Sequence, residues 1–241
     1  MDVDRFESFV QAVLSTDELW RALVRFARAR GVDKIGYHHM PPVGAPDDSV
    51  PRIRNAGFPA EWVEYYFAAR QAGTLPITDH ARRHGKPVYW DDIETLRELT
   101  ADERAHLAKL RAAGFVYGLA VPAYGPNGRN GIFEVALAAG VERLDPPVLA
   151  ELNWACQVTH LRYCALILPD IGAPPPLSRR EKEVLTWVAR GKSNAAIAAI
   201  LGISAHTVDA HLRRIYQKLG VFDRISAALR GIGYGLITSE A

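Results

Sequence analysis

Cysteine is scarce in this 241-residue chain, and segments that direct proteins to membranes are missing from it. Its two cysteines, Cys156 and Cys164, lie eight residues apart in a helical pattern. By helix rise they are about 12 Å apart, which is too far for a disulfide. We find no secretory signal, no apolar run of transmembrane length and no lipidation motif. These absences argue against a disulfide-stabilised secreted domain and predict a cytoplasmic protein with reduced thiols.

Catalytic motifs are also lacking. The chain has no Gly-x-Ser-x-Gly elbow, no phosphate-binding loop and no zinc-protease motif. His80 and His84 have the i, i+4 spacing of a metal site and lie beside Asp79, but their charged neighbours favour a solvated helix face. His38 and His39 alternate across a predicted strand, so they cannot both face one metal. We therefore expect no enzyme activity, no cofactor and no metal site.

Charge is nearly balanced overall but unevenly distributed. The chain has 29 lysine and arginine residues against 27 acidic residues, a net charge of +2. Residues 177–241 hold ten of the basic and five of the acidic residues, a net charge of +5, which leaves −3 for the first 176 residues. Because a cationic module favours a polyanionic partner, the C-terminal part is a candidate for nucleic-acid binding.

The C-terminal sequence carries the start and stop signals of short helices. Ser178 followed by Glu181 three residues later is a capping box that predicts a helix start, and Gly191 supplies the stop. A second helix is expected to begin at Ser193 or Asn194. Its predicted buried face consists of Ile197, Ile200 and Leu201. Two short helices in succession predict a compact helical module.

A third helix is expected after the glycine-containing turn at 202–204, with Ser204 as its cap. Its inward side is Val208, Leu212, Ile215 and Leu219. Its outward side carries His206, Asp209, Ala210, Arg213, Arg214 and Lys218. Short residues near the N-terminal end, followed by cations, are typical of a recognition helix that reads bases and holds phosphates. The alternative is a plain three-helix bundle with a solvated basic face.

The first part of the chain alternates between helical and strand patterns. Two opening helices are indicated by Phe6, Val10 and Leu14, and then by Leu19, Leu23, Phe26 and Ala27. The further expectations are a strand over 34–40, an aromatic-rich helix over 61–71, strands over 114–122 and 131–138 around a turn at 124–128, and a helix over 147–166. We therefore predict an α+β fold: an N-terminal α-β-α sandwich with an antiparallel sheet, and a C-terminal all-α four-helix helix-turn-helix domain.

A proline-rich run at 168–176 is the expected linker, because consecutive prolines cannot continue a helix and favour an extended spacer. The predicted domains are therefore 1–167, which binds a small molecule, and 177–241, which binds DNA. A phosphoreceiver domain is excluded for the first of these. Its opening is helical, and Asp33, the acid flanking the first strand, precedes that strand.

The segment 177–229 resembles the output domain of LuxR-type regulators, which NarL-type response regulators share. The resemblance rests on Leu-Ser-Arg-Arg-Glu-Lys-Glu-Val-Leu from 177, Gly-Lys-Ser-Asn from 191, Leu-Gly-Ile-Ser from 201 and Lys-Leu-Gly from 218. It implies bases contacted by Asp209, Ala210 and Arg213, and phosphates contacted by Lys192, Thr207, Arg214 and Lys218. Asp209 departs from family members with a basic residue there, so the operator preference cannot be carried over.

Residues 10–165 resemble the signal-binding domain of quorum-sensing LuxR-type proteins. The hallmark residues in register are Trp62, Tyr66, Pro76, Trp90 and Gly118. The resemblance implies an acyl-homoserine lactone ligand. Tyr66 would donate to its amide carbonyl, Trp62 to its lactone carbonyl, and Trp90 would lie near the head group. Trp62 and Tyr66 are one helical turn apart and project into the same space, although such aromatics can also be plain core.

One family hallmark is missing: Leu75 stands where the family has an Asp that accepts the ligand's amide N–H. A buried amide without an acceptor costs about 1–3 kcal/mol. Glu134 is our candidate substitute, and by alternation it shares a strand face with Ile132, Ala136 and Ala138. Glu134 could equally select a ligand with extra donors or an amine, or face solvent on an edge strand.

These observations predict a ligand-responsive transcriptional regulator that senses an acyl-homoserine lactone. The resemblance implies a homodimer on a palindromic site in double-stranded DNA, with RNA polymerase as a further candidate partner. A helix over 224–236 offers a second dimer contact, or it simply completes the helical bundle. Two alternatives remain for the input: a different signal, such as an aryl or amine compound, or a domain that acts without ligand.

Overall fold

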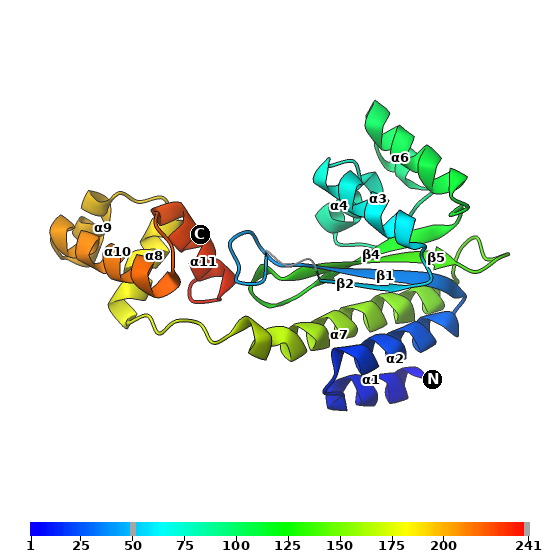
Figure 1. Cartoon of the computed structure of the whole chain (residues 1–241), viewed down its shortest axis with the longest axis horizontal. Coiled ribbons are helices and arrows are strands. Elements are labelled where there is room, and N and C mark those ends of the chain that lie inside the picture. The colour runs from blue at the N-terminus through cyan, green and yellow to red at the C-terminus, as the bar shows by residue number, and fades with distance from the viewer. Residues whose placement is uncertain (49–51, 239–241) are drawn as a thin grey trace. The chain divides into compact units, whose positions relative to one another are not determined.

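The computed structural model describes residues 1–48 and 52–238 and divides the chain into two compact units (Figure 1). The first unit comprises residues 1–39, 52–125 and 130–166; the second comprises residues 40–51, 126–129 and 167–241. The first contains a sheet covered by helices, and the second is mainly helical. The predicted α+β class is therefore confirmed.

Among the described residues, the sheet has five strands in the order β2-β1-β5-β4-β3. They are β1 (Val32–Met40), β2 (Arg52–Ala56), β3 (Val88–Tyr89), β4 (Gly118–Tyr124) and β5 (Asn130–Leu137). β1 pairs with β2, β3 with β4 and β4 with β5, each antiparallel. Ala120 of β4 pairs with Glu134 of β5, and β5 lies between β1 and β4. The edge-strand alternative for Glu134 is therefore wrong.

Helices cover both faces of the sheet (Figure 1). On one face lie α1 (Val3–Ala12), α2 (Thr16–Arg28) and α7 (Pro146–Ile171); on the other lie α3 (Ala60–Gln71), α4 (Pro76–His84) and α6 (Ala101–Ala112). The short helix α5 (Ile93–Leu96) precedes α6. The sequence supplies local start signals: Ser15 caps α2, and Thr100 with Glu103 forms a capping box at α6. The α-β-α arrangement is the predicted one.

Several element ends differ from the expectation. α1 ends at Ala12, so Leu14 lies outside the helix and is 84% exposed, while Val13 takes the buried place. β4 begins at Gly118 rather than at residue 114, because α6 and its left-handed turn at Gly114 come first. α7 continues to Ile171, since Pro169 lies in its last turn, where few backbone hydrogen bonds remain to be lost. β2, β3, α5 and α6 were not predicted, because short or polar elements leave little periodicity.

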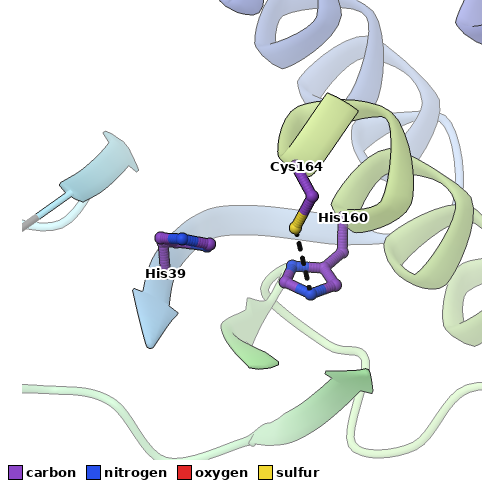
Figure 2. A group of neighbouring side chains, drawn as sticks. All are labelled: His39, His160 and Cys164. Carbon is purple, nitrogen blue, oxygen red and sulfur yellow. Dashed lines mark hydrogen bonds between the residues drawn. The ribbon is translucent and has the colours of Figure 1, made fainter. Parts of the chain in front are cut away.

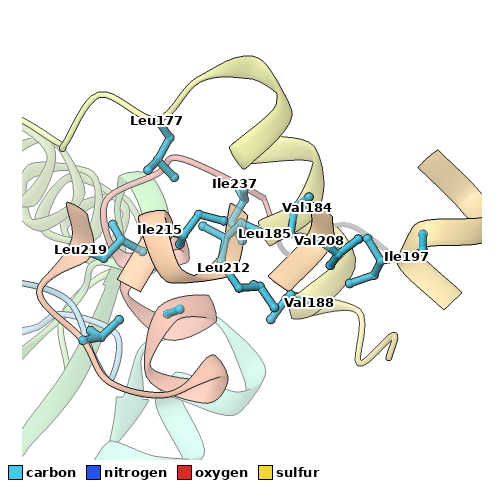
Figure 3. Close-up of a cluster of buried hydrophobic side chains, with 13 residues drawn as sticks. Leu177, Val184, Leu185, Val188, Ile197, Val208, Leu212, Ile215, Leu219 and Ile237 are labelled. Carbon is cyan, nitrogen blue, oxygen red and sulfur yellow. The ribbon is translucent and has the colours of Figure 1, made fainter. Parts of the chain in front are cut away.

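The second unit contains α8 (Arg179–Ala189), α9 (Asn194–Leu201), α10 (Ala205–Leu219) and α11 (Arg224–Gly233). The predicted caps are present: Ser178 and Glu181 form a capping box, and Ser193 and Ser204 cap the next two helices. Gly202 ends α9 in the left-handed conformation (φ 67°) that the sharp turn requires. The apolar core joins all four helices (Figure 3): Leu177, Val184, Leu185, Val188, Ile197, Ala198, Val208, Leu212, Ile215, Leu219, Val221, Ala227 and Ile237.

Two expectations for this unit need correction. Ile200 was expected inside but is 46% exposed, because Ile197, Ala198 and Leu201 fill the inner side of the short α9. The last helix ends at Gly233 rather than at residue 236. Its apolar face is divided: Ala228 and Ile232 pack against the core, whereas Ile225 is 70% exposed.

A buried ion pair also belongs to the second unit. The Arg129 guanidinium binds both carboxylate oxygens of Asp47, at 2.8 and 3.2 Å, and donates to the carbonyl of Gly233 at 2.7 Å. Both side chains are almost fully buried. No single helix in the described part of the chain is long and apolar enough to cross a membrane; only α9 and α10 taken together, across a 107° bend, have such length and composition.

Candidate ligand-binding site and nucleic-acid interface

Two adjoining pockets lie in the first unit between α3 and the sheet. Both pockets are narrow and open to solvent on one side. Both are lined by Phe58, Trp62, Tyr66 and Glu134. The first continues along His38 and Ile132, and the second reaches Leu75, Thr78 and Trp90. An apolar wall with a few polar groups is the usual lining of a small-molecule site.

Trp62 reaches the pockets from α3 and is held by an aromatic cluster. Its ring centroid lies 5.1 Å from that of Tyr65 and 5.0 Å from that of Phe115. Tyr65 stacks on His106, and its hydroxyl lies 3.0 Å from His106 Nδ1. Burial, aided by Lys109, lowers the pKa of His106 to about 4, so this ring is neutral near pH 7. The cluster fixes one wall without placing a charge on it.

The hydroxyl of Tyr66 is buried and has no well-formed hydrogen bond to any described residue. Tyr66 lies one turn after Trp62 on α3 and lines both pockets. Burial, with the nearby Glu134 carboxylate, raises the pKa of Tyr66 far above its ordinary value, so the phenol keeps its proton. A buried donor without a partner costs free energy, and a ligand acceptor would recover that cost.

Glu134 places a carboxyl group inside the same apolar space. Its Oε1 accepts a hydrogen bond of 2.6 Å from the hydroxyl of Thr78, in the first turn of α4. Burial raises the pKa of Glu134 to about 7, although side-chain hydrogen bonds from Thr78 and Trp90 oppose the rise. As alternation predicted, Glu134 and Ile132 share the pocket face of β5. The carboxyl therefore titrates near neutrality and can accept from a ligand.

Gly118 supports the site without lining either pocket. A Cβ on Gly118 would meet two atoms of the Trp90 ring at 2.5 Å and the carbonyl oxygen of Val135 even closer. Trp90, only 3% exposed, therefore packs directly over the Gly118 backbone. The backbone N–H of Trp90 donates to the carbonyl oxygen of Gly118 at 2.9 Å. Gly118 is required so that the Trp90 ring can reach the pocket.

Leu75 and Pro76 mark the start of α4. Leu75 stands at the N-cap without a side-chain hydrogen bond, and Pro76 is the first helical residue. Leu75 is 3% exposed and lines the second pocket beside Ile77. Pro76 is buried behind it and fixes the helix start. The wall that carries an acid in the family is therefore apolar in this chain.

The structure adds His38 and Thr78 to the residues predicted from sequence. His38 of β1 lines the first pocket, and Arg70 of α3 contacts both nitrogens of its ring. Burial, together with the charge of Arg70, lowers the pKa of His38 to about 3, so the ring is a neutral acceptor. Strand alternation put His38 on one face of the sheet, but only the unpredicted position of α4 brings Thr78 to Glu134.

The outer face of α10 is the candidate nucleic-acid interface. Arg213 and Arg214 are exposed, and Thr207, Asp209 and Ala210 are partly exposed. Arg213 forms an i, i+4 ion pair with Asp209 at 2.6 Å. The acid that departs from the family pattern is therefore paired with Arg213 in the DNA-free protein. Lys192, also exposed, lies in the loop between α8 and α9.

Lys218, an exposed residue near the end of α10, is bonded to other residues of the second unit. Its ammonium group binds Glu181 Oε2 at 2.7 Å and the carbonyl of Pro176 at 3.1 Å. Burial alone would raise the pKa of Glu181, but hydrogen bonds from Lys218 and Ser178 lower it. A phosphate contact by Lys218 would compete with this link between α10 and the start of α8.

Comparison with known proteins identifies the family of both parts of the chain. Residues 15–163 match the family described as "Autoinducer binding domain", and residues 175–230 match "Bacterial regulatory proteins, luxR family". The chain therefore belongs to the LuxR family of quorum-sensing transcriptional regulators that carry an autoinducer-binding domain. This is a family of regulators rather than enzymes, as the missing catalytic motifs predicted.

The relatives are named as transcription regulators, and they match most of the length of this chain. The chain is 33% identical to the HTH-type transcriptional regulator y4qH of Sinorhizobium fredii over 181 residues, which cover 75% of this chain and about half (55%) of that protein. It is 27% identical to the transcriptional activator AhyR of Aeromonas hydrophila, covering 94% of this chain and 88% of AhyR. The fold is similar to that of Escherichia coli SdiA, with a TM-score of 0.71, 23% identity and 98% coverage of both chains.

Proposed function

We propose that this regulator binds an acyl-homoserine lactone in the two adjoining pockets. The observation that carries the proposal is the position of Glu134: it lines the same pocket as Leu75, but from β5, whereas Leu75 lies at the start of α4. The acceptor that the family carries at the start of α4 is thus replaced by one on β5. The site keeps a carboxyl group for the ligand's amide N–H, although the motif at position 75 is lost.

The remaining polar groups complete a coherent ligand contact set. The buried Tyr66 hydroxyl, without a well-formed hydrogen bond to any described residue, is placed to donate to the amide carbonyl. Trp62 and Trp90 supply apolar area near the head group, and Trp62 also offers its indole N–H. The acyl chain would follow the apolar walls along Phe58 and Ile132. An amide whose two polar groups are both satisfied avoids a penalty of about 1–3 kcal/mol for each unmade bond.

A ligand without a lactone is the second candidate. Escherichia coli SdiA, which shares the fold, forms a crystallised complex with octanoyl-rac-glycerol, an acyl chain on a polyol head. Hydroxyl donors, or a protonated amine, would also suit a carboxyl that titrates near neutrality. This candidate keeps the pocket and the role of Glu134 and changes only the head group.

The experiment is a thermal-shift and calorimetric titration with acyl-homoserine lactones, octanoyl glycerol and an acyl amine. For a lactone, Glu134→Ala should weaken binding roughly ten- to a hundredfold, which is the cost of one unmade buried hydrogen bond. Leu75→Asp in that background should restore affinity, because it returns the acid to α4. Glu142→Gln, at an exposed acid, is the matched control. Unchanged lactone affinity in Glu134→Ala would remove Glu134 from the site, and binding of octanoyl glycerol alone would favour the second candidate.

For the output we propose that two copies bind a palindromic DNA site with α10 in the major groove, and that the bound dimer acts on RNA polymerase. The support is the exposed pair Arg213 and Arg214 on a capped helix in a module of net positive charge. The exposed Phe222 and Ile225, 98% and 70% exposed, offer the apolar contact between copies.

Binding to a palindromic operator, measured against salt, tests this output. Arg214→Ala should weaken binding to all sequences alike and lower the salt slope by about one, whereas Arg213→Ala should relax sequence preference. Arg179→Ala, at an almost fully exposed arginine on α8, is the control. Ile225→Asp should shift the dimer towards monomer in light scattering. A dimer that is unaffected would rule out the contact at Ile225.

A further inference from the structure

A second group of polar side chains lies on the face of the sheet away from the pockets. His39 comes from β1, and His160 and Cys164 come from α7 (Figure 2). One donor atom of each residue lies within 4.8 Å of the other two. The three side chains are almost fully buried, at 2%, 0% and 2% exposed. Imidazole nitrogens with a thiolate are the donor set that borderline transition ions prefer.

The spacing on α7 matches the size of a metal centre. His160 and Cys164 are four residues apart, so they share one face of the helix. Cys164 Sγ lies 3.6 Å from His160 Nε2. A tetrahedral Zn²⁺ with a thiolate at about 2.3 Å and an imidazole nitrogen at about 2.0–2.1 Å separates these two donors by about 3.5 Å. The pair is already at the separation that the ion demands.

Tyr37 supplies the outer support that such a centre needs. Its hydroxyl oxygen lies 2.8 Å from Nδ1 of His160 and 3.3 Å from Nδ1 of His39. A histidine that ligates a metal through Nε2 carries its proton on Nδ1 and donates it to a fixed acceptor. Space for this arrangement comes from Gly131 of β5, where a Cβ would lie 2.7 Å from both His160 Nδ1 and the Tyr37 ring.

We propose that the first unit holds one Zn²⁺ ion between β1 and α7, coordinated by His39, His160 and Cys164. Tyr37 orients the two rings, and the fourth position of the tetrahedron takes a small ligand such as water. The ion would join the sheet to the helix that packs on it, so its binding would contribute to the stability of this unit. The sequence did not predict the site, because its ligands lie more than 120 residues apart and only the histidine–cysteine spacing on α7 is local.

The test uses the full-length protein and a matched pair of cysteine variants. Both thiols are buried on α7, but only Cys164 belongs to the cluster, so Cys156→Ala is the control for Cys164→Ala. We expect about one zinc ion per chain by mass spectrometry in wild type and Cys156→Ala, and loss of zinc in Cys164→Ala. A chelator should lower the melting temperature of the first two proteins and leave the third unchanged.

Cobalt gives a readout that does not depend on the folding of a variant. Co²⁺ added to chelator-treated wild type should produce the thiolate-to-metal charge-transfer band, and zinc should displace it. If the charge-transfer band is retained in Cys156→Ala, it belongs to Cys164. Zinc content in wild type no higher than in Cys164→Ala, or wild type that shows neither zinc nor a cobalt band, would overturn the proposal. Occupation by copper alone would overturn the assignment to zinc.

Discussion

The buried carboxyl of Glu134 should make the first unit less stable as pH rises. Its pKa is raised from the ordinary 4.5 to about 7, mainly by burial. Between these two values the folded state keeps a proton that the unfolded state has released, so the free energy of unfolding falls with rising pH. Glu134 causes no loss of stability below about pH 4.5, and the full loss is reached above about pH 7.

The magnitude follows from the size of the shift. A displacement of about 2.5 pH units corresponds to about 3 kcal/mol at 1.36 kcal/mol per unit. This is an upper value, because the side chain keeps some exposure through the pocket. Glu134→Gln removes the ionisation and retains the shape and an acceptor. The variant should therefore gain up to about 3 kcal/mol over wild type at about pH 8 relative to about pH 5.

Urea denaturation followed by tryptophan fluorescence measures this difference, because Trp62 and Trp90 lie in the pocket walls. Wild type, Glu134→Gln and the exposed-acid control Glu142→Gln should be unfolded at both pH values without ligand. Groups other than Glu134 contribute equally to all three proteins and cancel in the comparison. If wild type and Glu134→Gln change in parallel between the two pH values, the carboxyl is not held in a protonated, buried form and the reasoning fails.

Three further perturbations test the supports of the two sites. Gly118→Ala should cost about 1–3 kcal/mol through the clash with Trp90 and the β5 backbone, measured by urea denaturation; a stability equal to wild type would contradict the close approach. Ser178→Ala should cost the second unit about 1 kcal/mol in the same assay, because the cap of α8 is lost; a stability equal to wild type would argue against the capping box. Glu181, whose pKa is lowered, contributes to the stability of the second unit above the ordinary glutamate pKa, and this contribution is lost as pH falls below it. Lys218→Met should therefore reduce the loss of stability of this unit at acid pH. An unchanged dependence of stability on pH would show that Lys218 does not hold the Glu181 carboxylate.

Local signals in the sequence were sufficient to place the starts of α8, α9 and α10 in the second unit. Its helices begin at serines that bond their own backbone, and the turn glycine lies at the position its φ requires, so each boundary depends on residues a few positions apart. The misplaced Ile200 shows the limit of the method. In a helix of eight residues several faces satisfy the same apolar spacing, and only the packing partners decide between them.

The first unit was predictable where an element was long and periodic, and unpredictable where partners meet across the fold. Alternation along β1 correctly separated His38 from His39, which now lie in the pocket and in the buried cluster respectively. No sequence pattern could show that Thr78 donates to Glu134, because the two are 56 residues apart on elements of different type. The same limit applies to His39 and His160, which α7 brings together from opposite ends of the unit.

Under the proposed function, the use of Glu134 in place of an acid at position 75 changes how ligand binding depends on pH. An aspartate at position 75 would stand at the N-terminus of α4, where the helix dipole and unpaired N–H groups keep a carboxylate ionised. Glu134 lies on a strand and titrates near pH 7, and an ionised acceptor binds an amide N–H more strongly than a neutral one. Under the proposed function, lactone affinity should rise with pH through about 7 in wild type, following the ionisation of Glu134, and stay flat above about pH 5 in the Leu75→Asp, Glu134→Ala double variant. Calorimetry over this range decides the matter: equal pH profiles for the two proteins would show that the ligand amide is not bound by Glu134.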